Sequence, residues 1–358
     1  MDLMFFVAAI VATLSLQVMI HELGHCIAAK LAGVEVEFYD FGVGPTLLRL
    51  TDRQGTVFNV KALPLGGFAQ LLDGWGSPIT EDNAARSFRE APPASKLAIT
   101  LAGSSANFLT AFVIILVLQL GGMQGTVPVI EVPGAETAGK AYAAGLRDGD
   151  RIVGVDGAEV TTWQDIGIQL FDRIGDTGEV ALSVSRDGER HEFAVAIGDW
   201  QSDRRFMNVF EDIGISHGSS EPLTLEESVI GRVWGAIEET FVLGITTAAA
   251  GFKMIFREMS ILNFMGPLEL LLIGEDSTSL DWVDYARLFA LFSIAMGIIN
   301  LLPGPVVDGV GVMLATGELV TRKRPTPRVE RNVRYAGVVL GFGPLVLCIG
   351  YEIARALA

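Results

Sequence analysis

The sequence HELGH, from His21 to His25, lies near the end of a long apolar run that begins at Leu3. Residues i and i+4 of an α-helix lie on one face, so the two histidine side chains can point at the same ion. Glu22 would lie beside that ion, close enough to act on a water molecule bound there. A lone buried histidine usually satisfies one hydrogen bond, but two histidines that bracket a glutamate at this spacing are hard to explain by packing. The motif therefore predicts a metal site with His21 and His25 as ligands and Glu22 beside it.

The cost of burying the motif supports the same interpretation. A carboxylate at the centre of a membrane helix costs about 2.5–3.5 kcal/mol, and a divalent cation beside Glu22 would offset that cost. The chain has 358 residues, of which 50% are hydrophobic and only 19% charged. Soluble domains of this length are rarely so apolar, so membrane spans are expected. The net charge of −16 argues against nucleic acid as a partner.

Four segments are predicted to cross a bilayer, since a span needs about 20 apolar residues. They are residues 3–32, 97–120, 285–302 and 335–354. The first has no basic leader and no cleavage site, so we expect it to be retained rather than removed as a signal peptide. Basic residues crowd the loop between the first two spans and the loop between the last two. The positive-inside rule then places both loops in the cytoplasm and both termini outside.

The segments between these spans define the expected domain organisation. An N-terminal membrane half, residues 1–122, contains a β-hairpin at 37–72 on the cytoplasmic side. Residues 123–227 are acidic and show the short strands and turns of a small independent domain. Residues 228–283 include a charged apolar stretch at 230–256, which we expect to lie at the outer membrane interface. Residues 284–358 form the C-terminal membrane half.

A zinc ion held by two histidines and a catalytic water needs a third protein ligand. The best candidate is Asp308, because it is the only acidic residue between Asp284 and Glu318. Prolines at 303 and 305 break the apolar helix just before it. Asp308 could instead cap the next helix, but an incomplete metal site favours its role as a ligand.

Two motifs, HELGH at 21–25 and NLLPGPVVDG at 300–309, resemble the signature motifs of the site-2 proteases. These are intramembrane zinc metalloproteases, and the chain is most similar to their bacterial RseP-like branch. The segments ALPLGGFAQLLDG, LAGSSANFLTAF, GPLELL and SIAMGIINLLP add to the resemblance, and AAGLRDGDRIVGVDG resembles a PDZ domain of bacterial envelope proteases.

The resemblance implies roles for particular residues. His21, His25 and Asp308 would hold one Zn²⁺ ion, and Glu22 would be the general base. Asn300 would lie on the substrate side of the cleft. The hairpin at 56–71 would clamp an unwound substrate by strand addition, with contacts from Gly66, Gly67 and Phe68.

The resemblance also implies a fold and a function. The chain would be a polytopic α-helical protein of the bacterial inner membrane, with four transmembrane helices, a membrane-associated β-hairpin and one extracytoplasmic α+β PDZ domain. It would hydrolyse peptide bonds in or near the transmembrane segment of single-span proteins such as anti-sigma factors or remnant signal peptides. The PDZ domain would screen these substrates, or would serve only as a tether.

Three departures from the family pattern are visible, and two other classes of protein compete with a protease. RseP has two PDZ domains and this chain has one, Ala295 stands where some relatives have asparagine, and VVDGV replaces the usual LDGG. A polytopic metal transporter usually shows internal repeats and several acids along a path, and neither is found. A non-catalytic membrane scaffold would normally lose Glu22, which is present.

Overall fold

The protein was studied as a computed structural model of residues 1–358, which describes residues 3–73, 77–122, 129–132, 140–173, 177–199, 210, 213–217, 228–255, 282–304 and 307–339. The chain divides into two compact units. The first contains Met1–Ile115, Thr240–Thr247 and Asp284–Leu347, and the second contains Leu116–Glu239, Ala248–Val283 and Cys348–Ala358.

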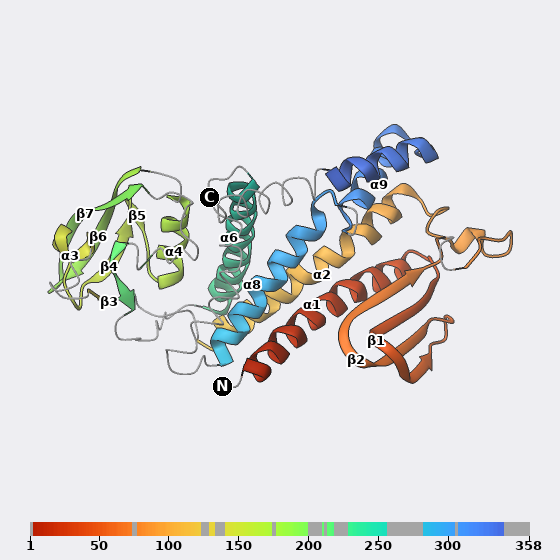
Figure 1. Cartoon of the computed structure of the whole chain (residues 1–358), viewed down its shortest axis with the longest axis horizontal. Coiled ribbons are helices and arrows are strands. Elements are labelled where there is room, and N and C mark those ends of the chain that lie inside the picture. The colour runs from red at the N-terminus through yellow and green to blue at the C-terminus, as the bar shows by residue number, and fades with distance from the viewer. Residues whose placement is uncertain are drawn as a thin grey trace, which may run out of the picture. The chain divides into compact units, whose positions relative to one another are not determined.

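Four helices build the first unit: α1 (Leu3–Leu31), α2 (Pro93–Leu120), α8 (Trp282–Leu301) and α9 (Gly309–Thr321). Helix α2 begins at a proline, which suits the first helical position because no intrahelical N–H bond is lost there. Helix α8 ends two residues before Pro303, which cannot continue a regular helix. Figure 1 shows α1, α2 and α8 as long helices that run beside one another.

Contacts among α1, α2 and α8 are close and partly polar. A Cβ atom at Gly24 of α1 would lie only 2.4 Å from the carbonyl oxygen of Ala102, so α1 approaches α2 through a glycine. Gln17 Nε2 donates to the carbonyl of Phe289 in α8 at 2.9 Å. Such side-chain bonds to backbone satisfy polar groups that the apolar surroundings would otherwise leave unpaired.

An antiparallel hairpin of β1 (Val36–Thr51) and β2 (Val57–Leu71) follows α1, as expected for residues 37–72. Its base packs on α1, where the Tyr39 hydroxyl donates to the carbonyl of Met19. Tyr39 also belongs to a buried cluster with Cys26 and Ile99. The rest of the hairpin exposes large apolar side chains: Val43, Leu47, Leu48, Leu50, Val60, Leu63, Leu65 and Phe68. A surface of this kind suits contact with lipid better than contact with water.

Only one helix among the described residues, α2, is long and apolar enough to cross a membrane by itself. The apolar helices Tyr285–Leu301 and Gly309–Thr321 are shorter. Most of the predicted span 335–354 lies outside the described residues. The four-span arrangement therefore stays a prediction.

Helix α6 (Val229–Ile255), most of which belongs to the second unit, covers the segment expected at the membrane interface. Charged side chains near its start form hydrogen bonds with the end of α2. Arg232 donates to the carbonyls of Gln119 and Leu120. Glu239 accepts a 2.8 Å hydrogen bond from Gln119 Nε2. The location of α6 at the outer membrane interface stays a prediction.

The rest of the second unit is a small α+β fold. Its elements are β3 (Ile130–Glu131), α3 (Lys140–Ala144), β4 (Arg151–Val155), β5 (Ala158–Glu159), α4 (Trp163–Asp172), β6 (Thr177–Arg186), β7 (Glu189–Asp199) and β8 (Ser216–His217). Four strands form one antiparallel sheet in the order β5-β4-β6-β7, and β3 pairs with β8. The sheet and α4 bury one apolar core, which includes Ile152, Ile166 and Leu182. The described residues of this region share one apolar core, and an independent PDZ domain here stays a prediction.

An ion pair joins Asp150, just before β4, to Arg186 at the end of β6. Arg186 donates two 2.7 Å hydrogen bonds to the two carboxylate oxygens of Asp150, which is 1% exposed. Burial alone would raise the pKa of Asp150, but hydrogen bonds from Arg186 and from the Arg147 amide hold that pKa below its ordinary value. The carboxylate therefore stabilises the fold only while it is ionised.

We expect Asp150→Asn to lower the free energy of unfolding of this domain by about 2 kcal/mol at neutral pH, because charge-assisted hydrogen bonds are weakened. The stabilisation by Asp150 is fully present above its pKa in the unfolded chain, about 3.9, and is lost as the pH falls through the lower pKa of the folded state. The difference between wild type and variant should therefore shrink in acid. Urea-dependent hydrogen exchange of the amides in β4 and β6 measures this difference in the free energy of unfolding.

The matched control is Glu159→Gln at an exposed position of β5, which should change the stability little. A loss of stability in Asp150→Asn that is the same at every pH would contradict the assignment.

Candidate metal centre

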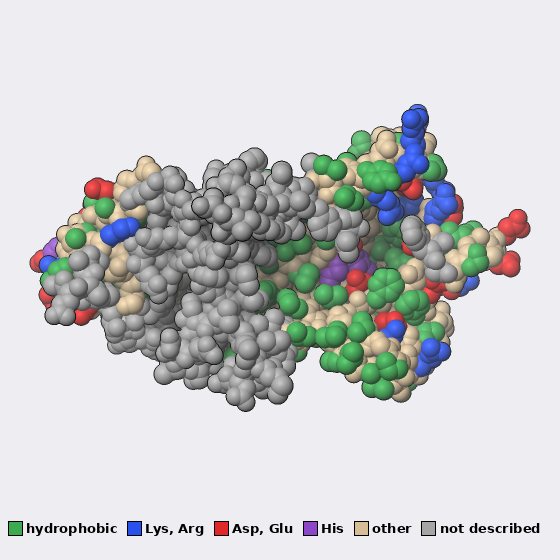
Figure 2. All heavy atoms as spheres, in the orientation of Figure 1, with side chains coloured by type: hydrophobic (Ala, Val, Ile, Leu, Met, Phe, Trp, Pro, Cys, Tyr) green, Lys and Arg blue, Asp and Glu red, His purple; other side chains and the backbone are tan. Residues whose placement is uncertain are grey.

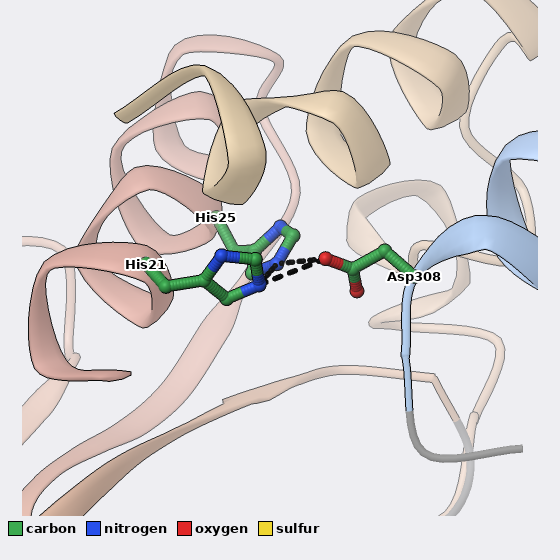
Figure 3. A group of neighbouring side chains, drawn as sticks. All are labelled: His21, His25 and Asp308. Atoms are coloured by element: carbon green, nitrogen blue, oxygen red, sulfur yellow. Dashed lines mark hydrogen bonds and ion pairs between the residues drawn. The ribbon is translucent and has the colours of Figure 1, made fainter. Parts of the chain in front are cut away.

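Three side chains from distant parts of the first unit converge on one point. His21 Nε2 and His25 Nε2 lie 2.8 Å and 3.0 Å from Asp308 Oδ2, and 3.1 Å from each other. Figure 3 shows the two imidazoles on one face of α1 with the Asp308 carboxylate turned toward them. Among the described residues, these three form the one group of histidine, cysteine and acidic side chains placed to hold a metal ion. The structure thus brings together the three ligands predicted from the sequence.

The spacing of the three atoms suits a small divalent cation. Tetrahedral zinc with ligand bonds of 2.0–2.1 Å separates its ligand atoms by about 3.3 Å. The observed separations of 2.8–3.1 Å would open only slightly to admit an ion. Two imidazoles and one carboxylate leave a fourth position for water, which is the donor set of a catalytic zinc site.

The position of Asp308 is set by the interruption of helical structure between α8 and α9. Asp308 is the N-cap residue of α9, but its side chain makes no capping hydrogen bond and faces the histidines instead. The next residue must be glycine, because a Cβ at Gly309 would lie 2.1 Å from the carbonyl oxygen of Leu302. The tight turn made by Gly309 therefore aims the carboxylate at α1.

The imidazole of His25 has a defined tautomer. Its Nδ1 lies 2.7 Å from the carbonyl oxygen of Ile99 in α2. A carbonyl only accepts hydrogen bonds, so Nδ1 carries the proton and Nε2 keeps its lone pair for a metal. A hydrogen bond from the second ring nitrogen is the usual support of a histidine ligand.

Gly103 of α2 makes room for both imidazoles. A Cβ atom at this position would lie 2.4 Å from His25 Nε2 and 2.6 Å from His21 Nε2. The space beside the ligands therefore exists only because residue 103 has no side chain. Sequence reasoning missed both Gly103 and the Ile99 carbonyl, and the one available signal was a glycine within the apolar run 97–120.

Glu22 is held by the hairpin rather than by another helix. Its Oε2 accepts a 3.0 Å hydrogen bond from the backbone N–H of Ala69 in β2. This contact requires that β2 approach α1 closely, and a Cβ at Gly67 would lie 3.1 Å from the Met19 side chain. The Ala69 amide is a second feature that the sequence did not reveal.

Salt bridges anchor α9, which carries Asp308 at its start. Lys96 of α2 lies 2.8 Å from Glu318 of α9, and both residues are buried. Beyond the end of α9, Arg324 donates two 2.8 Å hydrogen bonds to Glu90. The Arg324 guanidinium holds the pKa of Glu90 below its ordinary range. These pairs link α9 to the start of α2, the helix that supports His25.

The four residues predicted to bind substrate lie on α8 and β2. Asn300 donates to the carbonyl of Met296 within its own helix at 3.0 Å. Gly66 has a positive φ of 73°, Gly67 packs on α1, and Phe68 is 51% exposed. In Figure 2, histidine side chains are visible in an opening lined with hydrophobic groups, on the part of the face that is described.

Comparison with known proteins gives one family match. The sequence profile of Peptidase family M50 matches residues 9–344. A protein of Clostridium acetobutylicum, provisionally named a zinc metalloprotease, is 28% identical over 86% of this chain and 85% of its own length. A protein of Campylobacter jejuni with the same provisional name is 25% identical over 98% of this chain and 93% of its own length. The regulator of sigma E protease of Haemophilus influenzae is 22% identical over 95% and 96%.

We expect Gly103→Ala to weaken metal binding by about 10-fold or more, since the added methyl group displaces both imidazoles. Titration with Co²⁺ in detergent, followed by its visible absorption, measures the affinity and the coordination geometry. Gly317→Ala in α9 is the matched control, because nothing lies within 4 Å of a Cβ built there. Unchanged Co²⁺ affinity in Gly103→Ala would show that the space beside Gly103 does not matter for the site.

Proposed function

Because this chain belongs to peptidase family M50, the site-2 proteases, we propose that it hydrolyses peptide bonds in or near the transmembrane segment of single-span membrane proteins. It is a metalloprotease that uses zinc, as its relatives' names state for them. The observation that carries the proposal is the convergence of His21, His25 and Asp308 beside Glu22.

His21, His25 and Asp308 are the proposed zinc ligands. When bound, zinc supplies Lewis acidity that polarises a carbonyl and lowers the pKa of water. Glu22 is the proposed general base. The Ala69 amide holds Glu22 through Oε2, so we assign proton transfer to Oε1, from the attacking water to the leaving amine.

The proposed substrate site lies along the outer edge of β2. The N–H of Ala69 points away from β1 and toward Glu22, so this edge borders the metal centre. An extended substrate segment that paired with β2 would pass the catalytic carboxylate. Gly66, Gly67 and Phe68 belong to this edge, and Asn300 would bind the substrate from α8. A scissile peptide must first leave its helix, because helical carbonyls are already hydrogen-bonded.

The proposed location is the bacterial inner membrane, with four spans and with both termini outside the cytoplasm. The apolar surface of the hairpin and the exposed side chains of α2, among them Leu109, Val113 and Val117, support contact with lipid. The metal centre would then lie near the cytoplasmic side, where water has access. The α+β domain within residues 123–227 would be an extracytoplasmic PDZ domain that screens substrates such as anti-sigma factors or remnant signal peptides.

Glu22→Gln should bind one zinc ion per chain as the wild type does, but should lower cleavage by about 10²–10⁴-fold, since the amide cannot accept the proton. Purified protein and a single-span substrate in detergent allow both quantities to be measured. Normal cleavage by Glu22→Gln would remove the general-base assignment. Cleavage by the wild type distinguishes a protease from a transporter or a scaffold, neither of which should cleave the substrate.

Asp308→Ala should lower the zinc content of the purified protein markedly, because only two ligands remain. Asp187→Ala, in the β6–β7 turn of the other unit, is the control and should keep its zinc. Elemental analysis of the two variants gives the stoichiometry. Full zinc content in Asp308→Ala would move the third ligand to another residue.

A further inference from the structure

We propose that Asn107 of α2 is a positioning residue that turns the imidazole of His21 so that its Nε2 faces the metal. The inference rests on the proposed function, since only a bound ion gives this orientation a purpose. Asn107 is fully buried, and its amide Nδ2 lies 3.4 Å from His21 Nδ1. Its backbone is held from α8, where the Ser293 hydroxyl donates to the Asn107 carbonyl at 2.9 Å.

The amide of Asn107 has one atom with a partner and one without. Its Oδ1 is buried and has no hydrogen-bond partner, whereas its Nδ2 faces the ring nitrogen. A buried carbonyl oxygen without a donor is costly. The oxygen and nitrogen exchange places by rotation of the amide through half a turn. After this rotation Oδ1 would accept a hydrogen bond from His21 Nδ1–H.

The rotated amide decides which nitrogen of His21 carries the proton. If Nδ2 donated to Nδ1, the proton would be on Nε2, where it would block coordination. If Oδ1 accepts from Nδ1–H, the lone pair of Nε2 is directed at the point shared with His25 and Asp308. His25 is already held in this way by the Ile99 carbonyl. Asn107 would give the two ligands the same tautomer.

Three residues of α2 that contact or make room for the histidines lie on one face of that helix. Ile99, Gly103 and Asn107 are spaced by four residues, so they lie along one face of the helix. The first supplies a carbonyl to His25, the second leaves space for both rings, and the third contacts His21. Helix α2 would thus support both histidines without providing a ligand of its own.

The test is zinc affinity, measured by competition with a chelator in the full-length protein in detergent. Asn107→Leu, which has a similar size but no acceptor, should bind zinc about 10–100-fold more weakly. Asn107→Asp keeps an acceptor and should bind within a few-fold of wild type. Thr110→Val is the control on the same helix, since the Thr110 hydroxyl donates within α2 to the carbonyl of Ala106, at 2.8 Å. A residue needed only for folding would not be rescued by aspartate in this way.

A second measurement uses the wild type alone. The ¹⁵N shifts of the histidine side chains should show the proton of His21 on Nδ1 in the zinc-loaded protein. A proton on Nε2, wild-type affinity in Asn107→Leu, or equal weakening in Asn107→Asp would each overturn the inference. If the wild type itself bound no zinc, the proposed function would fail together with the inference. Normal zinc binding by wild type and by Asn107→Leu would overturn the inference alone.

Discussion

Close packing of α1 against α2 is the constraint on which the metal centre depends. The two helices approach through Gly24 and Gly103, where any side chain would collide with the facing helix or with the imidazoles. At this distance the backbone of α2 reaches the ring of His25 through the Ile99 carbonyl. Larger residues at the two glycines would separate the helices, and the histidines would then lose their support even though HELGH itself was intact.

Polar groups in an apolar environment explain much of the remaining architecture. Each charged group near the centre has a partner: Asp308 faces two histidines, Glu22 accepts from Ala69, and Lys96 pairs with Glu318. A buried ion pair contributes little net stability but specifies geometry, because any displaced arrangement leaves a charge without a partner. In this protein the Lys96–Glu318 pair fixes where α9 lies, and α9 begins at the residue that completes the metal centre.

The sequence predicted the side chains of the candidate metal centre better than the groups that hold them. His21, Glu22 and His25 were recognisable because helical spacing alone brings them together, and Asp308 because it is an isolated acid at a helix break. The hairpin was predictable from its alternating residues and turns. In contrast, the Ile99 carbonyl and the Ala69 amide are backbone groups that every residue has. Their roles come from tertiary packing, so no residue type marks them in the sequence.

The metal centre joins His21 to an aspartate that follows 287 residues later. During synthesis the first helix, the hairpin and the α+β domain all leave the ribosome before Asp308 does. A nascent chain therefore lacks this candidate metal centre until its C-terminal portion has been translated. The order of these residues along the polypeptide therefore delays formation of the metal centre until synthesis is nearly complete.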